Sequence, residues 1–459
     1  MSSEWGEITL GEVCAAQNGA IQTGPFGSQL HASDYVETGI PVVMPSNIGP
    51  DGGISEDGIA RIKQQDADRL SQHKLQIGDV VFSRRGDVTR NALIEPHQVG
   101  WLCGTGCLKV RLGDETKADA KFISYCLRSP ETKEWLIRHA VGATMPNLNT
   151  SILSAVPIQI PPISEQKKIT ELLRALDDRI DLLRETNATL EAIAQALFKS
   201  WFVDFDPVHA NAGTQAPSLP AEIQALFPSR LVESPQGLMP EGWEVKPFGE
   251  LLTHTIGGDW GDELPTDKNN VRVAIIRGTD LPDLANGSYG RVPLRFTNEK
   301  KLSSRKLQDG DLVLEVSGGS KDQPTGRSLY LTTGMLNQFD CPMEPASFCR
   351  LLRPSSPEIG VVLAQHLTYI YALGKTWEYQ NQSTGISNFQ TTHFLETELV
   401  VVPDTKVLKA FFEIARPMVD RANLTQMTKL AELRDTLLPR LISGQLRLPE
   451  AEAAFAEVV

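Results

Sequence analysis

The pattern of apolar and polar positions is most regular near the middle of the chain, in residues 163–202. From Ile169 onward apolar residues recur at alternating steps of four and three, and one polar residue, Asn187, interrupts them. A seven-residue repeat of this length keeps one face of a helix against a partner helix. It predicts a helix of ~40 residues and ~60 Å, since each residue adds ~1.5 Å. The positions are Ile169, Leu173, Leu176, Ile180, Leu183, Asn187, Leu190, Ala194, Leu197 and Trp201.

A second apolar stripe lies near the C-terminus, in residues 405–442. It is less regular and contains Pro417, which a helix interior tolerates poorly, so we expect a break or kink near Arg416. The main part of this helix is expected to run from there to Ile442. Its apolar positions repeat those of the first stripe at a constant offset of 240 residues: Leu430, Leu433, Leu437, Leu438, Leu441 and Ile442 against Leu190, Ile193, Leu197, Phe198, Trp201 and Phe202.

Short strands and turns dominate residues 1–160. Strands are predicted at 39–44, 78–82 and 156–160, and a helical pattern over 122–139 is broken at Pro130 into two short helices. The same order returns after residue 241. The segment at Gly242 echoes the one at Trp5, the Gly310-Asp-Leu-Val strand echoes Gly78-Asp-Val-Val, and residues 385–403 echo 142–162.

These echoes predict a tandem repeat of two units, each a globular domain followed by a long helix. The predicted class is α+β with two similar mixed α/β domains. We place the first domain at 1–160, its long helix at 161–206, a surface linker rich in Pro, Gly, Ala and Ser at 207–240, the second domain at 241–403, its long helix at 404–445, and a C-terminal tail at 446–459.

Composition narrows the class of protein. The net charge of −13 argues against nucleic-acid binding by bulk charge, so any such contact needs clustered cations or a partner that supplies them. There is no run of eighteen apolar residues and no basic-then-apolar leader, so a cytoplasmic protein is expected. The six cysteines form no CxxC pair, and reduced core thiols are expected rather than a metal site.

Enzymatic motifs are not found. The chain has no Asn/Asp-Pro-Pro-Tyr/Phe segment of an amino methyltransferase, no GxxxxGK[ST] phosphate loop, no GxSxG elbow and no HExxH pair. We therefore assign no catalytic residue, no metal ligand and no cofactor bound by this chain.

Several motifs together resemble the specificity subunit of type I restriction–modification systems. They are Gly24-Pro-Phe-Gly-Ser28 with Asp34-Tyr35, Gly78-Asp-Val-Val, Pro161-Pro-Ile-Ser-Glu-Gln-Lys-Lys-Ile169 and the tail from Leu433 to Gly444. The resemblance covers nearly the whole chain.

The resemblance implies two target recognition domains, each reading half of a bipartite, asymmetric site in double-stranded DNA. An antiparallel pair of long, coiled-coil-like helices, related by an internal pseudo-two-fold repeat, holds the domains apart and sets the spacer. Two methyltransferase subunits dock on this scaffold, and translocase–nuclease subunits join them. The specificity subunit is non-catalytic, so S-adenosylmethionine, ATP and Mg are expected on the partner subunits.

Candidate readers of DNA lie in loops that follow strands, where Arg, Lys, Asn and Gln meet bases and hydroxyls hold phosphate. The arginine-rich loop after the strand at 78–82 is the first choice, with solvated surface arginines as the alternative. A structural turn is the alternative for the loop before the first long helix. The candidates in the first domain are Gln22, Thr23, Ser83, Arg84, Arg85, Thr89, Arg90, Asn147 and Asn149.

The equivalent loop of the second domain is rich in glycine, which permits close approach of the backbone to phosphate. A polar segment at 379–383 is a further candidate. The candidates in this domain are Ser317, Ser320, Lys321, Gln323, Thr325, Arg327, Gln380 and Asn381.

Asn187 is the one polar residue of the first stripe, and Met427 takes its place in the second. A lone Asn at a core position commonly fixes the register of paired helices, and plain tolerance of a polar group is the alternative.

Two other classes of function stay open from the sequence. One is a self-sufficient or nuclease-associated DNA modification protein with an unrecognised active site. The other is a coiled-coil scaffold that does not touch DNA.

Overall fold

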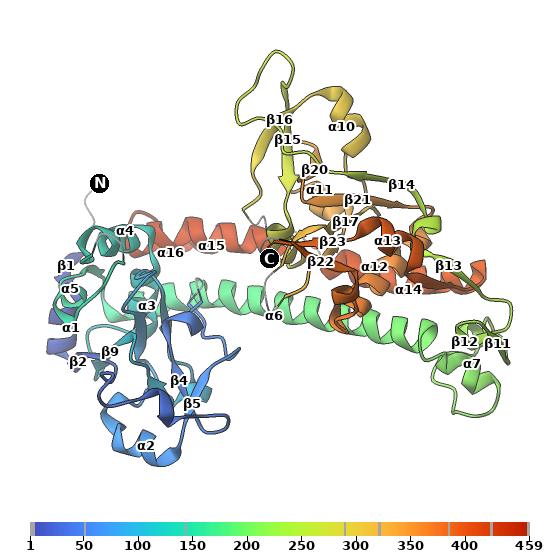
Figure 1. Ribbon diagram of the computed structural model, residues 1–459. Helices are drawn as coiled ribbons and strands as arrows, with labels where there is room; N and C mark the ends of the chain where they lie inside the picture. The colour runs from blue at the N-terminus through green and yellow to red at the C-terminus, as the bar shows by residue number, and fades with distance from the viewer. Residues whose placement is uncertain are drawn as a thin grey trace. The chain divides into compact units, whose positions relative to one another are not determined.

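The computed structural model describes residues 5–49, 52–142, 145–288, 291–319, 323–383, 386–422 and 426–456. The chain forms two compact units, the first made of residues 1–179 and 430–459, the second of residues 180–429. The elements of both are labelled in Figure 1.

The first unit contains two four-stranded sheets and one two-stranded pair. The sheet with strand order β2-β9-β6-β7 is antiparallel throughout, the sheet β3-β5-β4-β8 includes one parallel pair, β4 with β8, and β1 pairs with β10. The strands are β1 Gly6–Thr9, β2 Asn18–Thr23, β3 Tyr35–Val36, β4 Ile40–Val43, β5 Ala60–Ile62, β6 Val80–Ser83, β7 Asn91–Leu93, β8 Leu102–Cys103, β9 Cys107–Gly113 and β10 Pro157–Ile160.

Short helices cover these sheets. The predicted break at Pro130 is confirmed, because α3 ends before it and α4 begins at it, with Ser129 as the N-cap of α4. Proline suits the first position of a helix, where its missing N–H would have no partner. The helices are α1 Leu10–Ala16, α2 Gln64–Arg69, α3 Ala120–Arg128, α4 Pro130–His139 and α5 Thr150–Ser154.

The second unit repeats this topology. Its antiparallel sheet β14-β21-β17-β19 has the strand order of β2-β9-β6-β7, its sheet β16-β15-β20 repeats the parallel pair in β15 and β20, and β13 pairs with β24 as β1 does with β10. A further sheet, β18-β23-β22, is added. The strands that repeat are β13 Glu244–Pro247, β14 Leu252–Gly257, β15 Val271–Ile276, β16 Leu294–Thr297, β17 Leu312–Glu315, β19 Ser328–Tyr330, β20 Met343–Pro345, β21 Cys349–Pro354 and β24 Leu399–Val402.

The added strands and the helices complete the second unit. They are β18 Ser317–Gly318, β22 Gln380–Ser383, β23 Ile386–Phe389, α9 Leu281–Ala285, α10 Glu299–Arg305, α11 Thr333–Leu336, α12 Pro357–Ala372 and α13 Thr391–Thr397.

One ion pair recurs at the same place in both units. In the first, Arg111 on β9 donates from Nε and Nη2 to Asp79 at 2.7 and 2.6 Å, and Asp79 also accepts from the backbone of Gln76 at 2.9 Å. Asp79 is buried, and paired hydrogen bonds are what a buried carboxylate needs. The second unit has the same arrangement in Arg353, Asp311 and Gln308. The predicted tandem repeat is therefore confirmed in three dimensions.

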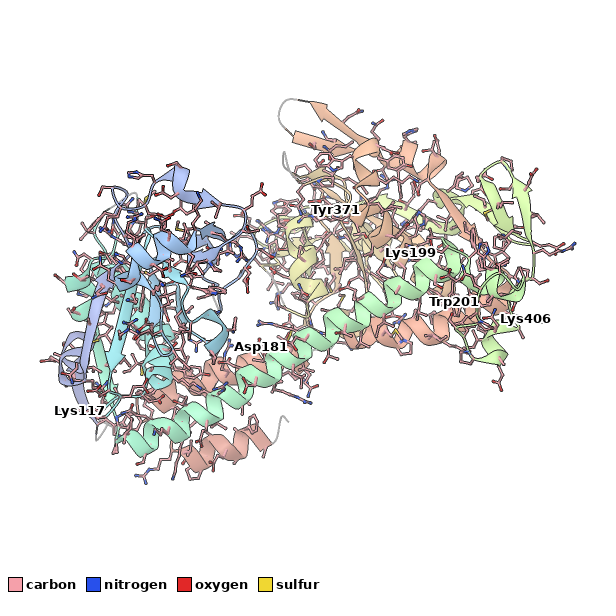
Figure 2. The ribbon with its side chains drawn as sticks, turned by 90° about the horizontal axis from the view of Figure 1, so that it is seen from below. Lys117, Asp181, Lys199, Trp201, Tyr371 and Lys406 are labelled. Atoms are coloured by element: carbon pink, nitrogen blue, oxygen red, sulfur yellow. The ribbon has the colours of Figure 1, made fainter. Side chains whose placement is uncertain are left out.

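The predicted long helix is α6, Ile163–Phe202, of 40 residues. Its apolar stripe is buried towards both ends, and in the middle Leu183, Asn187 and Leu190 are half-buried. The helix is tied at its start by the buried Gln166, whose side chain accepts from Asp119 N at 2.9 Å and donates to Pro161 O and Lys117 O at 2.8 Å. Several residues along α6 are labelled in Figure 2.

The side-chain amide of Asn187 makes no hydrogen bond within the described part of the chain. Its proposed part in fixing the register of the helix pair therefore stays a prediction.

The C-terminal helices are α14, Thr405–Ala422, and α15, Gln426–Ile442. Within the second unit α14 runs antiparallel to α6. The Phe411 ring lies 5.6 Å from that of Trp201, whereas Val419, later in α14, shares a cavity with Glu191, earlier in α6. Within the first unit α15 is tied to α6 by Arg434, which donates to Asp177 at 2.9 Å.

Of the break or kink predicted near Arg416, the break is wrong and the kink stays a prediction. Helix α14 continues through Pro417 as far as Ala422. Pro417 lies on the exposed side, as does Glu413, four residues earlier, whose carbonyl is the one that loses its helical N–H. Water can satisfy that carbonyl, which makes the proline tolerable there.

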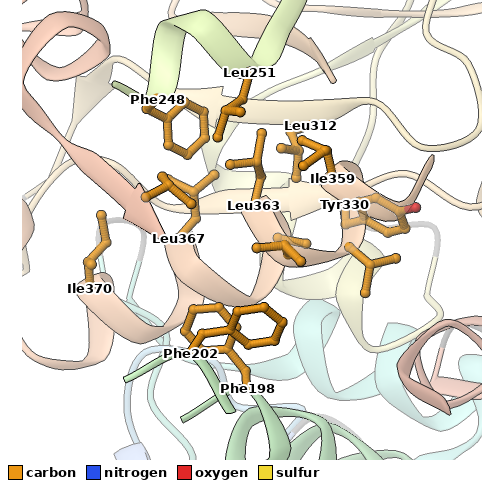
Figure 3. Close-up of a cluster of buried hydrophobic side chains, with 14 of the residues drawn as sticks. Phe198, Phe202, Phe248, Leu251, Leu312, Tyr330, Ile359, Leu363, Leu367 and Ile370 are labelled. Carbon is orange, nitrogen blue, oxygen red and sulfur yellow. The ribbon is translucent and has the colours of Figure 1, made fainter. Parts of the chain in front are cut away.

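Residues 207–240, predicted as a surface linker, are instead folded into the second unit. Val208 and Phe227 are buried in its main core, where the Phe227 ring packs edge-on against Trp201 at 4.9 Å. The same core, shown in Figure 3, contains Phe198 and Phe202 of α6. The segment forms α7 Asp206–Asn211, α8 Ala221–Gln224 and the hairpin β11 Leu231–Ser234 with β12 Gly237–Pro240, and the predicted tail contains α16 Leu448–Ala456.

Candidate DNA interface

Loops gather at one end of the antiparallel sheet in the first unit. Strand β9 lies between β2 and β6 and runs antiparallel to both. The last residues of β2 and β6 and the first residues of β9 therefore lie at the same end of the sheet. Gly24 N donates to Cys107 O and Arg84 N donates to Gly106 O, each at 2.9 Å. We call this the first loop face, made of residues 22–28, 84–90, 104–106 and 145–149.

A second loop joins the first loop face through backbone pairing. Arg85 and Asn147 form an antiparallel bridge, and Leu148 N donates to Arg84 O at 2.9 Å. The structure therefore brings together the arginine loop and the asparagine loop, which lie about sixty residues apart in the sequence. Gln22, exposed, and Thr23, half-buried, end β2 at this same edge.

Part of the arginine loop is occupied by its own internal hydrogen bonds. Ser83 is buried and donates to Arg85 O at 2.9 Å, while Thr89 and Arg90 donate to Asp87 at 2.6 and 3.0 Å. Partial burial would raise the pKa of Asp87, but these hydrogen bonds outweigh it and hold the pKa below its usual value. These contacts give Ser83, Thr89 and Arg90 structural roles.

Two arginines of this loop donate no side-chain hydrogen bond to the described residues. Arg85 is exposed, and Arg84 is half-buried with an Nε that is buried and finds no acceptor among the described residues. A buried donor without a partner is costly, so an acceptor supplied from outside would stabilise it. Asn149, by contrast, caps α5 by accepting from Ile152 N at 2.8 Å.

The second unit has a corresponding second loop face, made of residues 257–262, 316–319, 323–327, 346–348 and 386–389. Ser317 pairs with Asn388 across β18 and β23, and both side chains are at least partly exposed. Gln323 and Asn381 are exposed. The candidates Ser320 and Lys321 lie outside the described residues.

Three candidates of the second domain serve the fold instead. Arg327 donates to Glu315 at 2.9 and 2.6 Å, and this pairing raises the pKa of Arg327. Thr325 is fully buried, and its N and Oγ1 donate to Gln380 at 2.9 and 3.1 Å. Because their polar atoms are already bonded within the protein, we do not retain Thr325, Arg327 or Gln380 as base readers.

The candidates that the structure leaves available are fewer than the sequence predicted. In the first unit they are Gln22, Thr23, Arg84, Arg85 and Asn147, and among the described residues of the second they are Gln323 and Asn381. The Ser317 hydroxyl already donates to Asn388 Oδ1 at 2.5 Å. Asn388 joins the candidates although sequence reasoning missed it; its place in the segment that echoes the asparagine loop was the available signal.

In the described ranges no three His, Cys, Asp or Glu side chains are grouped so that they could hold a metal ion. The cysteines are free thiols, and burial raises the pKa of Cys103 to about 12. No helix in the described part of the chain is long and apolar enough to cross a membrane.

Comparison with known proteins agrees with this architecture. Residues 2–192 match the family model of the type I restriction modification DNA specificity domain. The chain is 25% identical over 340 residues to the MjaIX specificity subunit of Methanocaldococcus jannaschii, covering 72% of this chain and 70% of that one. It is also 25% identical over 373 residues to the HindI specificity subunit of Haemophilus influenzae, covering 71% and 77%.

A solved structure supports the same fold. The S subunit of a type I system from M. genitalium superposes with a TM-score of 0.53 at 16% identity, covering 96% of each chain. Specificity subunits are generally non-catalytic. Residues 2–192 thus match the DNA specificity domain of type I restriction–modification systems, and over about seven tenths of its length the chain is similar to specificity subunits of such systems.

Proposed function

We propose that each unit reads one half of a bipartite duplex site, and that the helices between the units set the number of unread base pairs. The observation that carries this proposal is the repeated topology, with the same strand order, the same Arg–Asp pair and a loop face in each unit. Two similar units in one chain suit two half-sites, which present similar groove surfaces.

In this proposal the length of the helix pair sets the distance between the two half-sites. One heptad adds ~10 Å along a helix, and this corresponds to about three base pairs at ~3.4 Å each. Deleting residues 182–188 together with the repeat-related residues 422–428 should therefore shorten the unread gap by about three base pairs. The measurement is the methylated motif in the DNA of cells that express the variant with its methyltransferase subunit.

Removing seven residues preserves the apolar repeat of α6 and, in the sequence, that of the second stripe, so the helices should still pair. Residues 423–425 lie outside the described residues. Thr186→Ala, an exposed substitution in the same stretch that leaves the length unchanged, is the control and should keep the parental gap. A variant that methylates at the parental spacing would contradict this role of the helix pair.

Exchange of one unit tests the division of labour. Replacing residues 1–160 by the corresponding domain of a relative should change one half of the methylated motif and leave the other half and the gap intact. A motif altered in both halves would contradict independent reading.

Chemistry is assigned to the partners. Two methyltransferase subunits and the translocase–nuclease subunits are proposed to bind this chain and to carry S-adenosylmethionine, ATP and Mg. The purified chain alone should then transfer no methyl group from labelled S-adenosylmethionine to DNA, whereas the complex should. Methyl transfer by the chain alone would favour a self-sufficient modification enzyme.

A further inference from the structure

Exposed aromatic side chains stand on both loop faces. Phe26 is 58% exposed and Phe348 is 65% exposed. Phe26 has a counterpart in Trp260, because each follows by two residues a close-packed glycine just after a strand, Gly24 after β2 and Gly258 after β14. Trp260 is less open, at 39%, and Arg295 covers its ring at 4.9 Å.

The backbone around Phe26 is held firmly while its ring faces solvent. Phe26 N donates to the Gln29 side chain at 3.0 Å, and Phe26 O accepts from Gln29 N at 2.8 Å. Arg69 in turn donates twice to Gln29 O, at 3.0 and 3.1 Å. On the other side, a Cβ at Gly24 would lie 1.9 Å from Gly104 O, so the loop is packed against the turn between β8 and β9.

Phe348 is attached directly to the loop that carries Ser317. Its carbonyl accepts from Val316 N at 2.9 Å and from Ser317 N at 3.3 Å. Phe348 directly precedes β21, as Gly106 directly precedes β9 in the first unit. The Gly106 carbonyl accepts from Arg84 N. Figure 1 shows β2 and β9 in one unit and β14, β17 and β21 in the other.

A single exposed apolar residue is ordinary. These two differ because each is fixed on a rigid backbone at the sheet edge that carries the polar candidates. Cations share these edges: Arg85 is exposed on the first loop face, and Arg305 donates to Gly257 O at 3.0 Å on the second. An aromatic ring at the same end of a sheet as a cation suits a ligand that combines an apolar flat group with negative charge, which describes a nucleotide.

We infer that Phe26 and Phe348 pack on nucleobases of the half-site that their own unit reads, each as an apolar wedge at a base step. The inference rests on the proposed function. Such wedges unstack a step partly and contribute contact that depends on how readily the sequence deforms. They would make the two rings specificity-determining residues next to the polar readers.

The test uses the full chain in complex with its methyltransferase subunits and duplexes that contain its methylated motif. Phe26→Ala and Phe26→Leu should each weaken specific binding about tenfold, whereas Phe26→Tyr, which keeps the ring, should bind nearly as tightly as the parent. The same series at Phe348 should behave alike. The Leu variants separate loss of the ring from loss of apolar bulk.

The base step that each ring contacts is located with 2-aminopurine, which is placed in turn at each position along each half-site. Binding of the parent complex should raise its fluorescence at one step of each half. Phe26→Leu should abolish the rise in one half alone, and Phe348→Leu in the other. Ile77→Ala is the matched control: Ile77 is 65% exposed but precedes β6 at the opposite end of the same sheet, so affinity and fluorescence should not change.

Three results would overturn the inference or its basis, and they are distinguishable. A parent complex that binds DNA without preference for the motif would refute the proposed function itself. A specific parent complex with Leu variants of equal affinity and fluorescence would refute the aromatic wedges alone. Leu variants that lose the methyltransferase subunits, seen by native mass spectrometry, would assign the rings to a protein contact instead.

Discussion

Replacement of Glu398 by alanine is expected to destabilise the second unit by about 3 to 5 kcal/mol, which is typical for removing one partner of a buried ion pair. Glu398 is 1% exposed and accepts from His366 at 2.8 Å, Lys375 at 3.0 Å and Tyr379 at 2.6 Å. Its loss leaves an imidazole, an ammonium group and a buried hydroxyl without their acceptor. Denaturant unfolding, with hydrogen exchange of the peptides around β24, measures the change.

The pH dependence of this contribution has a definite sign. Burial alone would raise the pKa of Glu398, but hydrogen bonds from His366, Lys375 and Tyr379 lower it from 4.5 to about 2. A carboxyl group with a lowered pKa in the folded state stabilises fully above its unfolded pKa. The stabilisation should therefore be present above pH 4.5 and be lost as the pH falls from 4.5 through 2.

A surface ion pair supplies the control for Glu398. Glu241 pairs with Arg230, and both side chains are exposed. Glu241→Gln should cost no more than about 1 kcal/mol, because exposed pairs are screened by solvent. If Glu398→Ala were as mild as this control, the buried network would have no part in holding the second unit together.

Replacement of Glu344 by leucine is expected to have the opposite effect and to stabilise the second unit. Glu344 is fully buried on β20, and neither carboxylate oxygen has a hydrogen-bond partner among the described residues. Its position in the repeat is taken in the first unit by Leu102, since β4 pairs with β8 as β15 does with β20. Leucine is thus the residue at the corresponding buried position of the first unit.

The stabilisation by Glu344→Leu should increase with pH. Burial and the nearby Asp259 raise the pKa of Glu344 to about 7, although Arg305 and Lys301 oppose the rise. Because the folded-state pKa exceeds the usual 4.5, ionisation costs stability as the pH rises from 4.5 to 7. Leucine should stabilise by roughly 2 to 3 kcal/mol more at pH 8 than at pH 5.

Denaturant unfolding at the two pH values measures this difference. Glu344→Gln, which cannot ionise but stays polar, should remove the pH dependence with a smaller overall gain. Glu263→Gln changes a carboxylate whose side chain is 82% exposed and should alter stability little at either pH. A gain from leucine that is equal at pH 5 and pH 8 would show that the pKa of Glu344 is the same in the folded and the unfolded protein, so that burial does not raise it.

Local periodicity was enough to predict α6, because apolar residues recur at steps of three and four along an amphipathic helix. The same holds for the division at Pro130 and for the order of the repeated strands. The sequence alone could not show that α14 continues through Pro417. The free-energy cost of this proline depends on whether the carbonyl four residues earlier meets water, and this follows from which side of α14 faces the core.

By itself the sequence determined the tandem repeat, the long helix and the loops in which polar side chains concentrate. Only the tertiary structure decided which of those side chains remain free to meet a ligand. Arg327 is paired with Glu315 and Thr325 with Gln380, whereas Arg85 is left exposed. Arg327 lies 12 residues from Glu315 and Thr325 lies 55 residues from Gln380. Neither separation is a helical or strand period, so the fold must first bring the donors and acceptors together.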